Sequence, residues 1–310
     1  MNATSTPPAI FLMGPTASGK TALAMALYQQ LPIEIISVDS ALVYRGMDIG
    51  TAKPSRTELA EVPHRLIDIR AIPDTYSVAC FRHDALAAMG EITARGHIPV
   101  LVGGTMLYFR ALQYGLSPLP AADPVIRAEL ESRLHSEGLA ALRAELARCD
   151  PQTAARVQDA QRITRALEVW YTTGRPLSVL QSQKGSTMPY QALKLICAPR
   201  ERSILHKRIQ DRFANMLTAG FEDEVAGLMA QLGLRAELPA LRAVGYRQMW
   251  SYLQGEFSYP TMIARGEAAT RQLAKRQLTW LRKETEAHWL PDEPRAQLTT
   301  ALQVIRRFNP

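Results

Sequence analysis

The sequence is poor in features that define several classes of protein. It has only three cysteines, Cys80, Cys149 and Cys197, and they form no C-x-x-C pair. We therefore expect a reducing compartment, with neither a disulfide-based fold nor a structural zinc site. No apolar run reaches the roughly 18 residues of a membrane span. The first eight residues hold no basic stretch and no long apolar one, so we expect a cytoplasmic protein without a secretory signal.

The composition is that of an ordinary globular protein. Its 310 residues, 47% hydrophobic and 21% charged, suit one large domain or two and exclude a disordered or collagen-like chain. Lys and Arg outnumber Asp and Glu by 36 to 29, which gives a net charge of +7. A basic balance favours a polyanionic partner, although many enzymes carry one without such a partner.

Apolar runs and helical patterns alternate in the first third of the chain. The runs Ala9–Met13, Ile33–Val38 and Ile98–Val102 predict buried strands, and the segments Thr21–Leu31 and Ser77–Arg95 predict helices. Strands that alternate with helices indicate an α/β fold with a parallel sheet. We expect a ligand to bind beyond the carboxyl ends of these strands.

The pattern changes after a proline-rich connection at residues 116–124. Two helical stretches, Val125–Ala147 and Thr153–Thr173, follow without a strand-like run. Strand character returns at Ala192–Ala198, and helical periods dominate from Ile204 onward. We therefore predict a core formed by residues 1–116 and 186–310 with a helical C-terminal region, interrupted by a mostly helical insertion domain at 117–185.

One segment carries a phosphate-binding pattern. Residues Gly14 to Thr21 read Gly-Pro-Thr-Ala-Ser-Gly-Lys-Thr and match G-x-x-x-x-G-K-[ST] in full. The match lies between a predicted strand and a predicted helix, where such a loop belongs. Its glycines let backbone N–H groups wrap a phosphate, Lys20 adds a cation, and the Thr21 hydroxyl can bind Mg²⁺. The motif fits a nucleoside triphosphate or a pyrophosphate equally well.

Asp39 directly follows the second predicted strand and is expected to face this loop. Three roles are open from its position alone. It could lie beside a magnesium ion as in nucleotide-hydrolysing proteins, it could act as a general base on a second substrate, or it could cap the next turn.

The segment Asp39–Pro54 resembles the signature of the bacterial tRNA dimethylallyltransferases, also called tRNA isopentenyltransferases. Further blocks resemble the family in its own order, at Pro63–Asp68, Val102–Tyr108, Gln161–Glu168, Ala243–Gln248 and Thr270–Gln277. The resemblance covers essentially the whole chain and implies a P-loop NTPase-like core. It also implies a monomer that moves a dimethylallyl group from dimethylallyl diphosphate to N6 of the adenosine on the 3′ side of the tRNA anticodon.

The resemblance implies roles for particular residues. The phosphate loop would hold a diphosphate rather than a nucleotide, with Mg²⁺ as cofactor on Thr21. Asp39 would be the general base, and Arg212 would lie at the diphosphate. The implied catalytic residues are Asp39, Arg212 and Thr105, and the implied diphosphate-binding residues are Gly14, Thr16, Ala17, Ser18, Gly19, Lys20 and Thr21. The implied RNA contacts are Asp39, Ser40, Ala41, Leu42, Thr105, Arg127, Gln161, Arg162, Ile163, Thr164, Arg165, Arg242, Ala243, Val244, Gly245, Tyr246 and Arg247.

Two basic sets need weighing against a simpler alternative. Arg271, Lys275 and Arg282 recur on one helical face in a stretch without acidic residues, and we predict that they contact RNA phosphates. The alternative is the solvated face of a core helix. Arg162 and Arg165 also share a helical face, and the alternative for them is a set of surface salt bridges.

The segment just before Arg162 departs from the family, because it lacks a His-Pro pair. This shortening could shift the start of the next helix.

Two other functions compete with this interpretation. A phosphate-loop kinase or nucleotide hydrolase would explain the loop and Asp39, but not the segment Asp39–Pro54. It would bind ATP and transfer or release its γ-phosphate. A non-enzymatic RNA-binding protein would explain the basic charge but would leave the phosphate loop unused, and it would show salt-dependent RNA binding without turnover.

Overall fold

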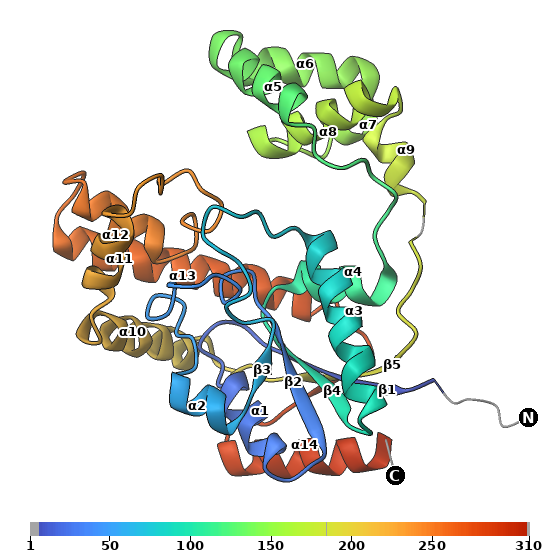
Figure 1. The fold of residues 1–310 in the computed structure, drawn as a ribbon, viewed down its shortest axis with the longest axis vertical. Helices are drawn as coiled ribbons and strands as arrows, with labels where there is room; N and C mark the ends of the chain where they lie inside the picture. Colours follow the sequence, from blue (N-terminus) through green and yellow to red (C-terminus); the bar gives the residue numbers. More distant parts are fainter. Residues whose placement is uncertain (1–5, 184, 309–310) are drawn as a thin grey trace, which may run out of the picture. The chain divides into compact units, whose positions relative to one another are not determined.

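In a computed structural model of the chain, residues 6–183 and 185–308 are described. They divide into two compact units, one formed by Met1–Arg110 with Pro189–Pro310 and the other by Ala111–Met188 (Figure 1). The smaller unit is therefore a few residues wider at each end than the predicted insertion at 117–185. Among the described residues, no helix is both long and apolar enough to cross a membrane.

The larger unit is built on one parallel sheet in the strand order β3-β2-β4-β1-β5-β6. The strands are β1 (Pro8–Met13), β2 (Ile33–Val38), β3 (His64–Arg65), β4 (Ile98–Gly103), β5 (Gln191–Ile196) and β6 (Ala287–Trp289). In the central register, Phe11 of β1 lies opposite Leu101 of β4 and Lys194 of β5. Strands β1, β2 and β4 are almost wholly buried, as expected for a parallel sheet with helices on both faces.

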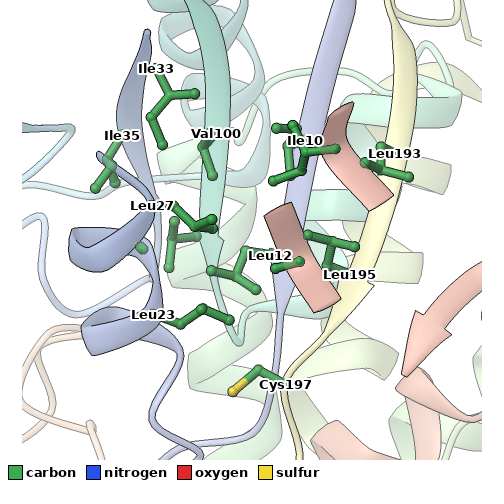
Figure 2. Close-up of a cluster of buried hydrophobic side chains, with 14 of the residues drawn as sticks. Ile10, Leu12, Leu23, Leu27, Ile33, Ile35, Val100, Leu193, Leu195 and Cys197 are labelled. Carbon is green, nitrogen blue, oxygen red and sulfur yellow. The ribbon is translucent and has the colours of Figure 1, made fainter. Parts of the chain in front are cut away.

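Helices cover the two faces of this sheet. On one face, α1 (Lys20–Tyr28) and α14 (Pro294–Phe308) bury their apolar sides against alternate residues of β1, β4 and β5 (Figure 2). On the other face, α3 (Val78–Ala94) packs on β4 and β2, and the start of α4 (Met106–Tyr114) lies over β1. There the Phe109 ring packs 5.1 Å from the ring of Phe11. Alternation along the strand sends neighbouring side chains to opposite layers.

The remaining helices of the larger unit lie in the connections between strands of the sheet. They are α2 (Arg56–Glu61), α10 (Arg202–Thr218), α11 (Phe221–Met229), α12 (Tyr246–Leu253) and α13 (Tyr259–Leu281), and the last four pack on one another (Figure 1). The long α13 packs on α10, where Gly266 lets the Phe213 ring approach so closely that a Cβ would lie 2.4 Å from it.

Helices are the only regular secondary structure of the smaller unit over its described residues. It contains α5 (Pro124–Ser136), α6 (Gly138–Cys149), α7 (Pro151–Ala154), α8 (Ala160–Thr173) and α9 (Leu177–Gln181). Its own apolar core includes Leu130 of α5, Leu142 and Leu146 of α6, and Ile163 and Leu167 of α8. A separate core is what allows this segment to form a compact unit.

The predicted α/β class with a parallel sheet is confirmed. The predictions differ from the structure in local detail. The stretch predicted as one helix over Val125–Ala147 is two helices, because Gly138 adopts a left-handed φ of 82°. The short strands β3 and β6 were not predicted, since two or three partly exposed residues give no periodic signal.

Candidate functional site

The phosphate loop connects β1 to α1 and has the backbone of an anion-binding turn. Ala17 and Gly19 have left-handed φ values of 61° and 92°, a conformation that turns successive N–H groups toward one side. The first N–H groups of α1 need a partner from outside the helix, and Gly19 offers no side chain to cap them. Gly14 must lack a side chain, because a Cβ there would lie 2.2 Å from the Cys197 carbonyl oxygen.

The loop lysine lies in this turn as predicted. Lys20 Nζ donates to the Pro15 carbonyl oxygen at 3.1 Å. Burial lowers the pKa of the Lys20 ammonium from 10.5 to about 8, although the nearby Asp39 carboxylate acts in the opposite direction. A buried cation with a lowered pKa gains strongly when an anion arrives beside it.

A cavity of about 480 Å³ lies beside the loop, within the larger unit. It opens at the carboxyl ends of β2 and β4, where a ligand site is expected in a parallel sheet. Its walls come from the phosphate loop, both strand ends, the 50–54 segment, α10, the 242–245 loop and α13, and they include Thr16, Lys20, Thr21, Asp39, Ser40, Ala41, Leu42, Thr105, Arg212, Arg242, Ala243, Val244 and Gly245.

Asp39 both caps a turn and faces the cavity. Its Oδ1 accepts hydrogen bonds from the backbone N–H groups of Ala41 at 2.8 Å and Leu42 at 3.4 Å. The carboxylate also interacts electrostatically with Lys20 and Arg212. The turn-capping role is therefore present, and it holds the carboxylate in a fixed orientation beside two cations.

Arg212 reaches this cavity from α10, a helix far away in the sequence. Its Nη2 donates to the Thr51 carbonyl oxygen at 2.8 Å. Burial lowers the pKa of the Arg212 guanidinium, and Asp39 again opposes this effect. The cavity thus brings together one carboxylate and two desolvated cations from three separate elements.

Thr105 ties two strand ends together at the cavity. Its hydroxyl oxygen accepts from the Ser40 N–H at 3.3 Å, and its own N–H donates to the Val38 carbonyl at 3.3 Å. These bonds fix the loop after β4 against the residue that follows Asp39.

Sequence reasoning missed Gln277, which links the phosphate loop to the end of β4. Its Oε1 accepts from the Thr16 N–H at 2.9 Å, and its Nε2 donates to the Gly104 carbonyl at 3.0 Å. Gln277 lies within the Thr270–Gln277 block, but an uncharged side chain on a basic helix gave no signal of its own.

Polar atoms without partners also mark the cavity. Ser37 and His64 both line it, and the Ser37 hydroxyl and His64 Nε2 are buried without a hydrogen-bond partner among the described residues. The other ring nitrogen of His64 lies 2.7 Å from the Val62 carbonyl oxygen. The hydroxyl of Ser18 in the phosphate loop is likewise buried and unpaired. Such atoms indicate a place for a polar ligand or water.

Helix α13 presents two different faces. Leu273 and Trp280 line the cavity together with Arg276. Arg271, Lys275 and Arg282 lie on the other face of the helix. Lys275 and Arg282 are exposed, and Arg271 pairs with Glu267 at 3.1 Å.

The 242–247 segment divides between the cavity and the core. Arg242, Ala243, Val244 and Gly245 line the cavity, and Arg247 is exposed. Tyr246 is fully buried, and its hydroxyl donates to Glu224 at 2.5 Å. The Tyr246 ring therefore has no surface open to an RNA, although the resemblance placed it among the RNA contacts.

The remaining predicted RNA contacts lie together in the smaller unit. Arg127 and Arg165 both pair with the buried Glu168, at 3.0 and 2.8 Å. Gln161 and Arg162 are exposed at the start of α8, Thr164 bonds back to the Ala160 carbonyl, and Ile163 is buried in the core. Asp159 caps α8 by accepting from the Arg162 N–H at 3.0 Å, so the helix begins in order despite the shortened segment before it.

A parallel α/β sheet with a glycine-rich loop after its first strand, and with a cavity at the carboxyl ends of its strands, is the architecture of a P-loop NTPase-like core. Residues 42–284 match the family described as IPP transferase. The chain belongs to this family, and it is a tRNA prenyltransferase. The family resemblance seen in the sequence is thereby confirmed.

Solved structures agree with this assignment. The full-length tRNA isopentenylpyrophosphate transferase of Bacillus halodurans is 34% identical, with a TM-score of 0.71 over 97% of this chain and 96% of that one. The tRNA delta(2)-isopentenylpyrophosphate transferase of Staphylococcus epidermidis is 31% identical, with a TM-score of 0.71 over 98% and 100%. A eukaryotic dimethylallyltransferase, described as acting on tRNA, is 25% identical, with a TM-score of 0.79 over 96% and 78%.

Proposed function

We propose that this enzyme transfers a dimethylallyl group from dimethylallyl diphosphate to N6 of the adenosine on the 3′ side of the tRNA anticodon, with release of pyrophosphate. The observation that carries the proposal is the shared cavity of Asp39, Lys20 and Arg212. One carboxylate can accept a proton, and two cations can hold a diphosphate, in the same cavity.

Asp39 acts as the general base in this proposal. The N6 amine of adenine is a poor nucleophile, because its lone pair is delocalised into the ring. As the bond from N6 to the allylic carbon forms, the N6 proton passes to the Asp39 carboxylate. The carbon–oxygen bond breaks with its electron pair leaving on pyrophosphate. A positioned base contributes about 10²- to 10⁴-fold to such a step.

The phosphate loop and Arg212 stabilise the leaving group. Negative charge builds on the diphosphate as the carbon–oxygen bond lengthens. The backbone N–H groups of the loop, the Lys20 ammonium and the Arg212 guanidinium are already placed around the cavity. Donors and cations fixed before the reaction stabilise developing charge without reorganising.

Magnesium fits this cavity as a cofactor shared with the substrate. No group of three or more His, Cys, Asp or Glu side chains suitable for a metal occurs in the described part of the chain. The cavity instead offers the hydroxyls of Thr21 and Ser37, the latter buried and unpaired. This set suits Mg²⁺, which keeps several waters and shares phosphate oxygens. When bound at Thr21, Mg²⁺ would neutralise charge on the diphosphate.

The RNA substrate enters this proposal as an unstacked base. N6 can reach the allylic carbon only if the adenosine leaves the stack of the anticodon loop. The segments 39–42 and 242–245 and the side chain of Thr105 line the cavity that would receive it. Arg247, Arg271, Lys275 and Arg282 on the larger unit, and Arg127, Gln161, Arg162, Thr164 and Arg165 on the smaller one, are proposed to bind the surrounding RNA.

One turnover assay tests the proposal. The enzyme is incubated with Mg²⁺, dimethylallyl diphosphate and unmodified tRNA carrying adenosine beside the anticodon, and the digested nucleosides are weighed by mass spectrometry. A parallel reaction contains ATP in place of the diphosphate. We expect a dimethylallyl mass on adenosine in the first reaction only. Phosphate transfer from ATP, without a prenylated nucleoside, would overturn the proposal.

A further inference from the structure

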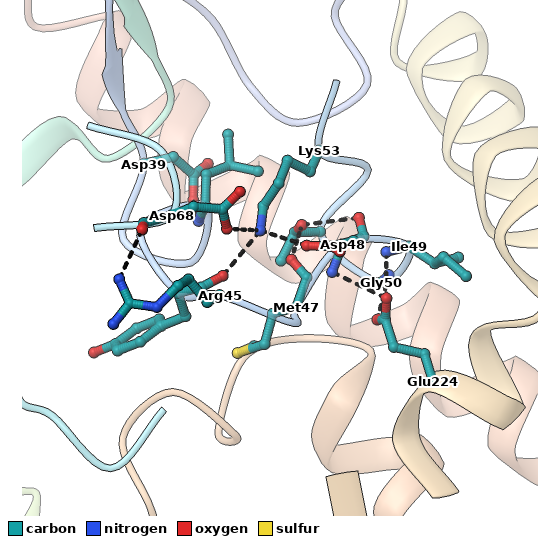
Figure 3. A network of polar contacts seen from close by, with 12 residues as sticks. Asp39, Arg45, Met47, Asp48, Ile49, Gly50, Lys53, Asp68 and Glu224 are labelled. Atoms are coloured by element: carbon teal, nitrogen blue, oxygen red, sulfur yellow. Dashed lines mark hydrogen bonds and ion pairs between the residues drawn. The ribbon is translucent and has the colours of Figure 1, made fainter. Parts of the chain in front are cut away.

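Glu224 on α11 is bound by four donors just outside the cavity. Its Oε2 accepts from the backbone N–H groups of Asp48 at 3.0 Å and Ile49 at 2.6 Å, and its Oε1 accepts from that of Gly50 at 3.1 Å (Figure 3). The Tyr246 hydroxyl donates the fourth bond, at 2.5 Å. A carboxylate that accepts three successive backbone N–H groups fixes the conformation of the segment that supplies them.

Helix α11 and Tyr246 both complement the carboxylate of Glu224. It lies in the first turn of α11, where the helix dipole stabilises a negative charge. Burial and the Glu224 charge raise the pKa of Tyr246, so its hydroxyl keeps the proton that it donates. The turn also packs directly on the helices, since a Cβ at Gly50 would lie 2.1 Å from the Phe221 ring and 2.6 Å from the Tyr246 ring.

The segment held by Glu224 leads straight to the site. Residues 50–52 line the cavity. Thr51 is the next residue after the three that donate to Glu224, and its carbonyl oxygen accepts the bond from Arg212 at 2.8 Å. The Thr51 hydroxyl turns back to the Met47 carbonyl at 2.7 Å. Lys53 closes the turn from its other end, with bonds to Asp48 and Asp68.

We infer that Glu224 is a positioning residue for the transfer reaction: by fixing residues 48–50 it sets the Thr51 carbonyl that orients the Arg212 guanidinium toward the diphosphate. Through Tyr246 it also couples this turn to the 242–245 loop on the RNA side of the cavity. The inference rests on the proposed role of Arg212 in holding the diphosphate. Glu224 itself does not line the cavity.

The chemistry of the carboxylate explains why an amide would not replace it. Two carboxylate oxygens accept all four bonds. A glutamine offers one acceptor oxygen, and its NH₂ group would face one set of N–H donors. Glu224→Gln therefore loosens the turn while keeping the size of the side chain.

A double-mutant cycle on inorganic pyrophosphate binding tests the inference. Isothermal titration calorimetry in the presence of Mg²⁺ compares the enzyme with Glu224→Gln, Arg212→Ala and the double variant. We expect each single substitution to weaken binding, by about tenfold or more for Arg212→Ala and about three- to tenfold for Glu224→Gln. Glu224→Gln should have little further effect once Arg212 is absent, because its influence passes through that residue.

Matched variants separate positioning from general stability. Asp223→Asn removes a carboxylate from the same helical turn, where Asp223 is exposed, and it should leave pyrophosphate affinity unchanged. Tyr246→Phe removes one donor to Glu224 and keeps the ring; it should weaken binding modestly, again only when Arg212 is present. If Glu224→Gln does not fold, as judged by circular dichroism, the Tyr246→Phe cycle decides the question.

The outcomes distinguish two failures. If Arg212→Ala weakens binding but the Glu224 and Arg212 effects simply multiply, Glu224 is a structural residue and the inference is wrong. If Arg212→Ala leaves pyrophosphate affinity unchanged, the proposed role of Arg212 fails, and the inference built on it fails too.

Discussion

Asp39, Lys20 and Arg212 lie together in the cavity, and their chemistry depends on how little water surrounds them. Burial lowers the pKa values of Lys20 and Arg212, and the Asp39 carboxylate partly offsets this effect for both. A diphosphate brings several negative charges to the same place. Its binding would therefore stabilise two cations whose charged forms burial disfavours.

The Lys20 ammonium makes diphosphate affinity depend on pH. Below its pKa of about 8, the lysine is charged before the anion binds. Above that pH the anion must bind together with a proton, so affinity should fall by up to about tenfold per pH unit. The measurement is the Kd of pyrophosphate between about pH 7 and pH 9.5.

The matched control for this pH profile is Lys20→Arg, which stays charged over the whole range. The ratio of the two Kd values removes the titration of pyrophosphate itself. A constant ratio across the range would show that Lys20 does not titrate near pH 8.

An isosteric substitution can separate the two roles of Asp39, capping of the turn and acceptance of a proton. Asp39→Asn keeps an oxygen that can accept from the Ala41 N–H but cannot take a proton from N6. We expect turnover to fall about 10²-fold or more, while tRNA and pyrophosphate still bind. Single-turnover rates and direct binding measure the two effects. Asp39→Ala is the companion that also loses the turn, and near-normal turnover of either variant would reject Asp39 as the base.

Among the helices, α8 carries one buried acidic side chain whose charge contributes to the stability of the smaller unit. Glu168 is 1% exposed, and it accepts from the Asp123 N–H at 2.8 Å and from Arg127 and Arg165. Burial acts to raise the pKa of Glu168, but its bonds to Arg165, Asp123 and Arg127 outweigh that effect and lower it. The Glu168 charge therefore stabilises the fold above its ordinary pKa of 4.5, and this contribution is lost as the pH falls below that value.

Removing that charge should loosen the smaller unit. Glu168→Gln leaves Arg127 and Arg165 without their carboxylate, and we expect a loss of roughly 2–4 kcal/mol in the local free energy of opening. Hydrogen exchange of the α8 amides measures it. Glu129→Gln, at an exposed position of α5, is the control. Equal exchange in the two variants would mean that the Glu168 network contributes nothing.

At the scale of the whole molecule, the net charge of +7 favours RNA through counterion release. On α13, the positive charge of Lys275 and the cavity wall lie on different faces of the helix. Its cavity face carries Leu273 and Trp280, and its exposed face carries Lys275. Binding of RNA and binding of diphosphate should therefore respond separately to substitutions on this helix.

Lys275→Ala should weaken tRNA binding and reduce the slope of log K against log salt by about one unit, with pyrophosphate affinity unchanged. Filter binding at several salt concentrations measures the slope. Lys207→Ala removes another exposed lysine, which pairs with Asp211, and serves as the control. A slope that Lys275→Ala leaves as it was would assign this lysine to a merely solvated face.

Several features of the fold follow from local chemistry and could be predicted from the sequence alone. The glycines of the phosphate loop, the apolar runs of β1, β2 and β4, and the ordered blocks of the family are all visible within short windows. They gave the α/β class, the family and the position of Lys20. They also placed Asp39 at a strand end, because the end of a buried run and the residue after it are local facts.

Contacts between residues far apart in the sequence could be known only from the folded chain. The Arg212 guanidinium on the Thr51 carbonyl, Gln277 on the phosphate loop and Glu224 under the 48–50 turn join segments separated by 161, 261 and 174 to 176 residues. Folding also buried Tyr246 and turned Trp280 toward the cavity. The periodicity of a sequence predicts which face of a helix is apolar, but it does not predict which element or cavity that face contacts.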